Sequence, residues 1–134
     1  MVLDRNTFKI HRLNKNTFIL SSGMYADVMN LWKKLDTQIS LYKLNNGGEL
    51  SSPSIANMVS RVLYEKRFFP FYTFNLVAGF DRERKPRIWG YDAVGSYGEQ
   101  SMGSMGSAQM FMIPYLDQMV GWFYKIDFFI GWLV

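Results

Sequence analysis

The sequence lacks cysteine and holds a single histidine, His11. Without cysteine, the chain can form no disulfide, no thiolate zinc site and no cysteine nucleophile. One histidine excludes a multi-histidine metal site, and a lone histidine in a strand is usually a surface or hydrogen-bonded residue. We therefore expect neither a metal nor a cofactor.

The sequence also lacks a run of about 20 apolar residues, the length that a membrane-spanning helix needs. Its most apolar stretch, residues 121–134 (GWFYKIDFFIGWLV), is shorter and is interrupted by Lys125 and Asp127. Charges from Asp4 onward leave no secretory signal visible. We therefore expect no membrane contact, although the aromatic side chains of this stretch keep binding at a bilayer interface as an alternative.

A large excess of charge of one sign is missing as well. Lys and Arg number 15 and Asp and Glu 11, and the net charge of +4 is too weak to indicate nucleic-acid binding. The densest charged segment, residues 81–87, mixes basic and acidic side chains. Such a mixture favours a solvated turn over a phosphate-binding surface or a pair of catalytic carboxylates.

Apolar and aromatic side chains are abundant, at 49% and 17% of the 134 residues. This composition is typical of a globular protein that buries a large core or interface. Residues 7–13 and 17–20 are rich in β-branched and aromatic types and are separated by Asn14, Lys15 and Asn16. This pattern predicts two strands joined by a tight turn.

Two helices are predicted next. The first has an apolar stripe at steps of three and four residues and ends at the Asn-Asn-Gly-Gly of residues 45–48. The second begins at Ser52-Pro53, because serine caps free N–H groups and proline lacks only an N–H that would have no partner there. The two stripes consist of Tyr25, Val28, Met29, Trp32, Leu35, Ile39 and Tyr42, and of Ile55, Met58, Val59, Val62 and Leu63.

Two more strands and a third helix are predicted to follow. Residues 73–80 and 87–92 indicate a hairpin, residues 95–106 a glycine-rich loop, and residues 107–120 a helix. Pro114 fits a first turn or a kink better than a smooth helix interior. Because the first two helices come as a pair between pairs of strands, the order predicts an α+β fold.

Several ordered blocks resemble a known family. Residues 41–81, LYKLNNGGELSSPSIANMVSRVLYEKRFFPFYTFNLVAGFD, resemble the helix–helix–strand block of 20S proteasome β subunits. Residues 88–97, IWGYDAVGSY, are similar to the strand and loop usually written D-P-V-G-S-Y, with Ala93 in place of the proline. The Arg-Phe-Phe-Pro of residues 67–70 resembles the non-catalytic class of β subunit at the sixth ring position.

The resemblance implies an αββα sandwich of the N-terminal-nucleophile hydrolase kind, here incomplete because the first strands are missing. Residues 1–121 would form this partial domain, and residues 122–134 a divergent apolar tail. The family implies a ring of seven different β subunits, paired with a second β ring between two α rings around a proteolytic chamber. Partners would then be other β and α subunits, in the cytoplasm and nucleus, acting in ATP- and ubiquitin-dependent protein degradation.

The residues predict no catalytic site. A threonine protease of this kind needs threonine at the mature N-terminus, where the free amine serves as the base. The chain opens with Met1 and contains no Gly-Thr junction. Gly106-Ser107 matches a serine that assists in active relatives, but it stands without a nucleophile. The internal threonines are Thr7, Thr17, Thr37 and Thr73.

Two segments are predicted to contact neighbouring subunits, because their aromatic and arginine residues lie outside the helical stripes and such residues are enriched at interfaces. A truncated or mis-spliced product that does not assemble, and a membrane-associated or peptide-binding module, stay open as alternatives. The predicted contact residues are Arg67, Phe68, Phe69, Pro70 and Tyr72 in the first segment, and Tyr91, Asp92, Gly95 and Tyr97 in the second.

Overall fold

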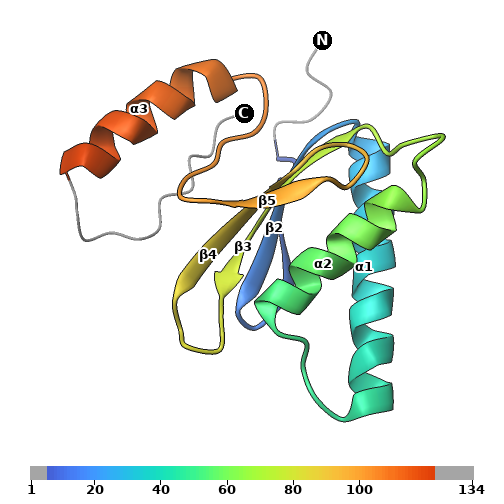
Figure 1. The fold of residues 1–134 in the computed structure, drawn as a ribbon. Coiled ribbons are helices and arrows are strands. Elements are labelled where there is room, and N and C mark those ends of the chain that lie inside the picture. The colour runs from blue at the N-terminus through green and yellow to red at the C-terminus, as the bar shows by residue number, and fades with distance from the viewer. Residues whose placement is uncertain (1–5, 123–134) are drawn as a thin grey trace.

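A computed structural model describes residues 6–122 and shows a mixed α+β fold with one antiparallel sheet (Figure 1). The strand order is β1-β2-β3-β4-β5, so each strand pairs with its neighbour in the sequence. The predicted α+β class is confirmed. The elements are β1 (Ile10–Asn14), β2 (Thr17–Gly23), α1 (Tyr25–Asn46), α2 (Ser52–Tyr64), β3 (Thr73–Phe80), β4 (Pro86–Tyr91), β5 (Tyr97–Gln100) and α3 (Gln109–Trp122).

The signals for the ends of the paired helices are confirmed. α1 ends at Gly47, which has a left-handed φ of 64° and whose N–H donates to the Lys43 carbonyl. α2 begins after Ser51, whose hydroxyl oxygen accepts from the N–H of Ser54. Glycine adopts a positive φ without a steric penalty, and a serine side chain satisfies one free N–H. The local sequence therefore predicts both helix ends.

The prediction of a continuous loop over residues 95–106 is wrong, because residues 97–100 form the edge strand β5. This strand pairs with β4 in the register Tyr91↔Tyr97 and Ile88↔Gln100. The Asp92 carboxylate accepts the N–H groups of Val94 and Ser96 and folds the connecting turn. All four residues of β5 are exposed, so the alternation of apolar and polar residues that reveals a half-buried strand is missing.

Two further details differ from the sequence prediction. Tyr25 and Met29 of the predicted apolar stripe are about half exposed, while Leu31 is fully buried. Pro114 lies inside α3, beyond its first turn, so of the two predicted placements the first turn is wrong and the kink stays a prediction. Apart from Trp122, the tail predicted over residues 122–134 lies outside the described residues.

One face of the sheet, called the covered face here, packs against α1 and α2, which lie on the same side in Figure 1. Polar groups on this face bond to one another. The Trp32 indole N–H donates to Ser21 Oγ at 2.9 Å, and the Ser21 hydroxyl donates to the Asn75 amide oxygen at 2.7 Å. Main contributors from the strands and helices are Ile19, Val77, Trp89, Leu31, Leu35, Ile55, Val59 and Leu63.

The other face, called the open face here, has a small buried centre that packs against Met105. Large apolar side chains around this centre stay partly exposed, and each alternates along its strand with the residues of the covered face. A Cβ on Gly103 would lie 2.7 Å from Leu76, so the segment before α3 crosses closely over this centre. The centre consists of Leu20, Leu76, Ala78 and Ile88, and its border of Ile10, Phe18, Phe74 and Phe80.

Candidate subunit interface

The connection from α2 to β3 displays two phenylalanines. Phe68 and Phe69 are 92% and 86% exposed, although the turn that carries them is fixed by its main chain. The N–H groups of Lys66, Arg67 and Phe69 donate to carbonyls three residues earlier, at 3.0 to 3.1 Å. The phenylalanines are therefore held outward by a hydrogen-bonded turn.

Side chains anchor the same turn. Phe71 is 5% exposed and lies in the core, and the Lys66 ammonium lies 4.7 Å from the centre of its ring. The Arg67 guanidinium lies 5.2 Å from the ring of Phe68, a cation–π distance. Pro70 and Tyr72 are exposed beside these residues. The structure thus places the contact residues predicted for the first segment on one surface, with Phe71 as a buried anchor between them.

The second predicted segment divides between interior and surface. Tyr91 is 3% exposed, its hydroxyl donates to the Ala56 carbonyl at 2.6 Å, and burial raises its pKa, with the neighbouring Tyr97 adding to the shift. Gly95 is buried against α2, where its carbonyl accepts from the Ser60 hydroxyl at 2.6 Å. These two residues hold the sheet to α2 and offer no surface to a partner.

Asp92 and Tyr97 remain at the surface. The Tyr97 ring stacks on Tyr91 with centroids 5.1 Å apart, and its hydroxyl accepts from the Asn57 amide at 3.3 Å. The Asp92 carboxylate is used by the turn that leads into β5. The surface part of the second segment is therefore much smaller than the turn at residues 67–72.

Two of the internal threonines, Thr17 and Thr73, are fully buried and make hydrogen bonds inside the fold. The Ser52 hydroxyl donates to the Phe80 carbonyl at 2.7 Å, so Thr17 is the donor in its 2.7 Å hydrogen bond to Ser52. Thr73 is buried and accepts from the Asn75 amide. Gly106 has a φ of 109° and, with the exposed Ser107, leads into α3.

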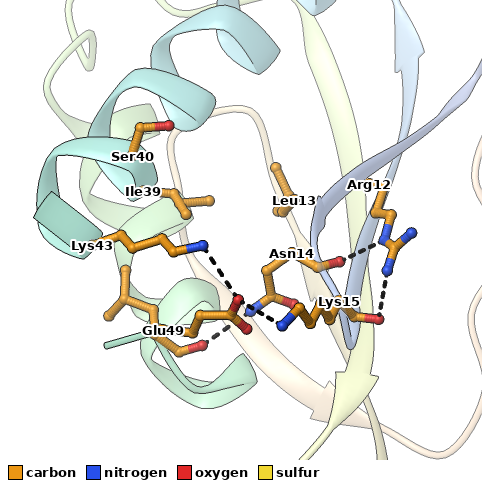
Figure 2. A pocket seen from close by; sticks show the side chains of 9 residues that line it. Arg12, Leu13, Asn14, Lys15, Ile39, Ser40, Lys43 and Glu49 are labelled. Atoms are coloured by element: carbon orange, nitrogen blue, oxygen red, sulfur yellow. Dashed lines mark hydrogen bonds and ion pairs between the residues drawn. The ribbon is translucent and has the colours of Figure 1, made fainter. Parts of the chain in front are cut away.

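A pocket of about 370 Å³ lies between the β1–β2 turn and the end of α1 (Figure 2). Lys15 and Lys43 share the carboxylate of Glu49 at 3.4 and 3.5 Å, and the Asn14 amide donates to the Leu50 carbonyl at 3.0 Å. The pocket is lined by mixed polar and aliphatic groups that satisfy one another. None of the predicted subunit-contact residues lines it.

The charged turn at residues 81–87 is also satisfied internally. The Asp81 carboxylate accepts from the N–H groups of Lys85 and Glu83 and from Arg87, and the Lys85 hydrogen bond is the largest cause of a lowered pKa. Arg87 also bonds Glu99 on β5. Across residues 6–122, no group of three or more potential metal ligands and no membrane-spanning helix is found.

Similarity to known proteins identifies the family of this chain. The model of the proteasome subunit family matches residues 1–126. Proteasome subunit beta type-1 of Dictyostelium discoideum is 44% identical over 119 residues, which make up 89% of this chain and 50% of that protein. The Arabidopsis thaliana protein of the same name is 40% identical over 116 residues, 87% of this chain and 52% of that protein.

A fungal relative agrees with these two. The probable proteasome subunit beta type-6 of Schizosaccharomyces pombe is 40% identical over 112 residues, which cover 84% of this chain and 50% of that protein. The chain spans about half the length of the curated relatives it matches. It belongs to the proteasome subunit family, and within that family its similarity is to the β-type subunits.

Proposed function

We propose that this chain is a non-catalytic structural β subunit of the 20S proteasome core particle. The observation that carries the proposal is the similarity to proteins named proteasome subunit beta type-1 over most of the chain. Peptide hydrolysis by the particle is carried out by sibling subunits. The partners of this chain are other β and α subunits. The proposal includes a place in the cytoplasm and nucleus and in ATP- and ubiquitin-dependent protein degradation.

The open face of the sheet supports this reading. An αββα sandwich packs two sheets face to face, with the helices outside. Here α1 and α2 cover one face, and the other carries a buried apolar centre with a partly exposed apolar border. We infer that the second sheet of the sandwich packs on this face. Without such a layer the apolar side chains of its border would stay exposed to water, which is unfavourable for a patch of this kind.

Assembly is tested by fractionating native cell extracts by size and detecting this chain. We expect it to migrate with a large multi-subunit particle that also contains α subunits. Elution as a monomer of about the mass of the free chain, 15.7 kDa, would contradict the proposal and favour the non-assembling product. Separate fractionation of nuclei and cytosol tests the location.

The non-catalytic role has its own test. The first threonine of the sequence is Thr7, and a Thr7→Ala variant incorporated into the particle should leave peptide hydrolysis unchanged. Peptide hydrolysis by the particle is measured with substrates for each sibling activity. A selective loss of one activity in the variant would overturn the non-catalytic assignment while leaving membership of the particle intact.

A further inference from the structure

The exposed aromatic turn continues into the start of α1, where the sequence predicted part of an apolar stripe. Met24, Tyr25 and Met29, at the start of α1, are 48%, 49% and 47% exposed. A helix that packs one stripe against a sheet normally buries such side chains. Their exposure next to residues 64–72 indicates that they belong to a surface shared with the turn.

Two hydrogen bonds join the start of α1 to the turn. The N–H of Met24 donates to the Tyr72 carbonyl at 2.8 Å, and the N–H of Tyr72 donates to the Asp27 carboxylate at 2.8 Å. An ion pair between Lys34 of α1 and Glu65, just after α2, also links α1 to the start of the turn. Because these bonds fix both segments, the exposed side chains form one surface of defined shape.

We call this surface the corner surface. It combines side chains from the start of α1, the end of α2 and the turn before β3, which lie together in Figure 1. A preorganised apolar surface loses little conformational entropy on binding, which favours tight association. Its apolar members are Met24, Tyr25, Met29, Tyr64, Phe68, Phe69 and Tyr72, all 47% exposed or more.

The charges around the corner surface have a clear sign. The segments that carry it, residues 24–34 and 61–72, hold five basic side chains and two acidic ones, a difference of +3. Both acidic groups are already engaged, Asp27 by the main chain of Tyr72 and Glu65 by Lys34. With Lys34 and Glu65 paired, four basic side chains remain against Asp27, so a partner meets an excess of positive charge. The basic residues are Lys33, Lys34, Arg61, Lys66 and Arg67.

We propose that the corner surface binds one partner protein that presents an apolar groove bordered by carboxylates. The inference rests on the proposed function, in which that partner is a neighbouring subunit of the particle. A second copy of this chain is the wrong occupant. In a symmetric contact between two copies, the same patch meets itself, so the basic side chains would face one another without counter-charges.

Removal of the aromatic pair gives the strongest test. We expect a Phe68→Ala/Phe69→Ala variant to enter the particle at least about tenfold less efficiently than the wild-type chain, in competition between differently tagged forms. The matched control is Leu44→Ala, which removes an apolar side chain that is 82% exposed at the far end of α1. Urea unfolding of the purified variants should coincide with wild type, which separates lost binding from lost folding.

Charge reversal tests the chemistry of the partner. A Lys66→Glu/Arg67→Glu variant should lose roughly fivefold or more in incorporation, because carboxylates would then face carboxylates. Arg84→Glu/Lys85→Glu makes the same change of charge in the exposed turn before β4 and should incorporate normally. Equal incorporation of the first variant and wild type would refute the proposal that carboxylates border the groove of the partner.

Cross-linking tests whether the corner is one surface. A photoreactive phenylalanine analogue at Tyr25 and, separately, at Phe69 should react with the same partner chain inside the purified particle. Reaction with two different subunits would refute a single surface, and reaction with a second copy of this chain would refute the acidic partner.

The two proposals can fail separately. If the wild-type chain is found in the particle but the Phe68→Ala/Phe69→Ala variant competes equally well, the corner surface is refuted and the proposed function stands. If the wild-type chain is never found in a particle, the proposed function fails, and the corner surface fails with it.

Discussion

The two faces of the sheet differ in what covers them, although their strands are the same. On β2, Ile19 faces α1 and α2 and is fully buried, while its neighbour Leu20 points to the open face and is 7% exposed. The covered face joins distant segments through both apolar packing and hydrogen bonds. The open face buries only a small centre. This difference teaches that two helices suffice to bury one face of the sheet completely, while large apolar side chains on the other face stay partly exposed.

The largest expected effect comes from the adjacent pair on β2. Ile19→Ala should lower the free energy of unfolding by about 4 kcal/mol, whereas Leu20→Ala should lower it by about 2 kcal/mol. The reason is that the surroundings of Ile19 are packed on all sides, while those of Leu20 can relax toward solvent. Urea unfolding of the purified chain measures both. Equal losses would break the distinction between the faces.

The next largest loss of stability is expected at Gly79, where β3 lies very close to the start of α2. A Cβ on Gly79 would lie 2.6 Å from Ser52 Oγ and 2.8 Å from the Asn16 carbonyl. We expect Gly79→Ala to destabilise the chain by about 2 kcal/mol, because the main-chain oxygen cannot move freely. The control is Gly98→Ala on the edge strand β5, where a Cβ would meet nothing within 4 Å. Thermal unfolding of both variants should show a lower midpoint for Gly79→Ala alone.

The buried Tyr91 predicts a dependence on alkaline pH. Its pKa is raised in the folded state, mainly by burial, so its stabilising effect is complete below the unfolded pKa of about 10. Above that pH the unfolded chain loses the proton and the folded chain keeps it, so the free energy of unfolding falls as pH rises.

Tyr91→Phe sharpens this prediction. The variant loses the hydrogen bond to the Ala56 carbonyl, at a cost of about 1 kcal/mol near neutral pH. It should also lose part of the alkaline decline, which unfolding curves between neutral pH and pH of about 11 would reveal. An unchanged alkaline slope would show that Tyr91 titrates normally in the folded chain.

The smallest effect is expected at the border of the open face. Ile10 is 45% exposed on β1, so Ile10→Thr should change the free energy of unfolding by about 0.5 kcal/mol or less. Light scattering at rising protein concentration should show less self-association, since one exposed apolar side chain is gone. A large loss of stability would mean that the open face is already packed.

Much of the fold could be predicted from the residues, because its signals are local. Gly47 and Ser51 mark helix ends through a positive φ and a capping hydroxyl, and the strands at residues 73–80 and 86–91 are strongly apolar. β5 escaped prediction because its pairing with β4 uses main-chain groups, which every sequence possesses. Periodicity likewise cannot show how much of an apolar stripe the sheet covers, so the exposure of Tyr25 and Met29, on either side of the buried Val28, was missed.

The candidate interface shows the same division. Phe68 and Phe69 stand out in the sequence as an aromatic pair outside any helical stripe, and they are exposed. The sequence also named Tyr91, but an aromatic side chain suits a core as well as an interface. Its hydrogen bond to α2 settles which of the two applies within this chain.

By itself, the sequence determined the helix and strand signals, the mixed α+β class and the resemblance to a family, because these depend on neighbours along the chain. Only the tertiary structure decided which face of the sheet is covered, which predicted contacts are interior, and that the start of α1 joins the turn at residues 64–72. The physical reason is that burial and hydrogen bonding between distant segments arise from packing in three dimensions.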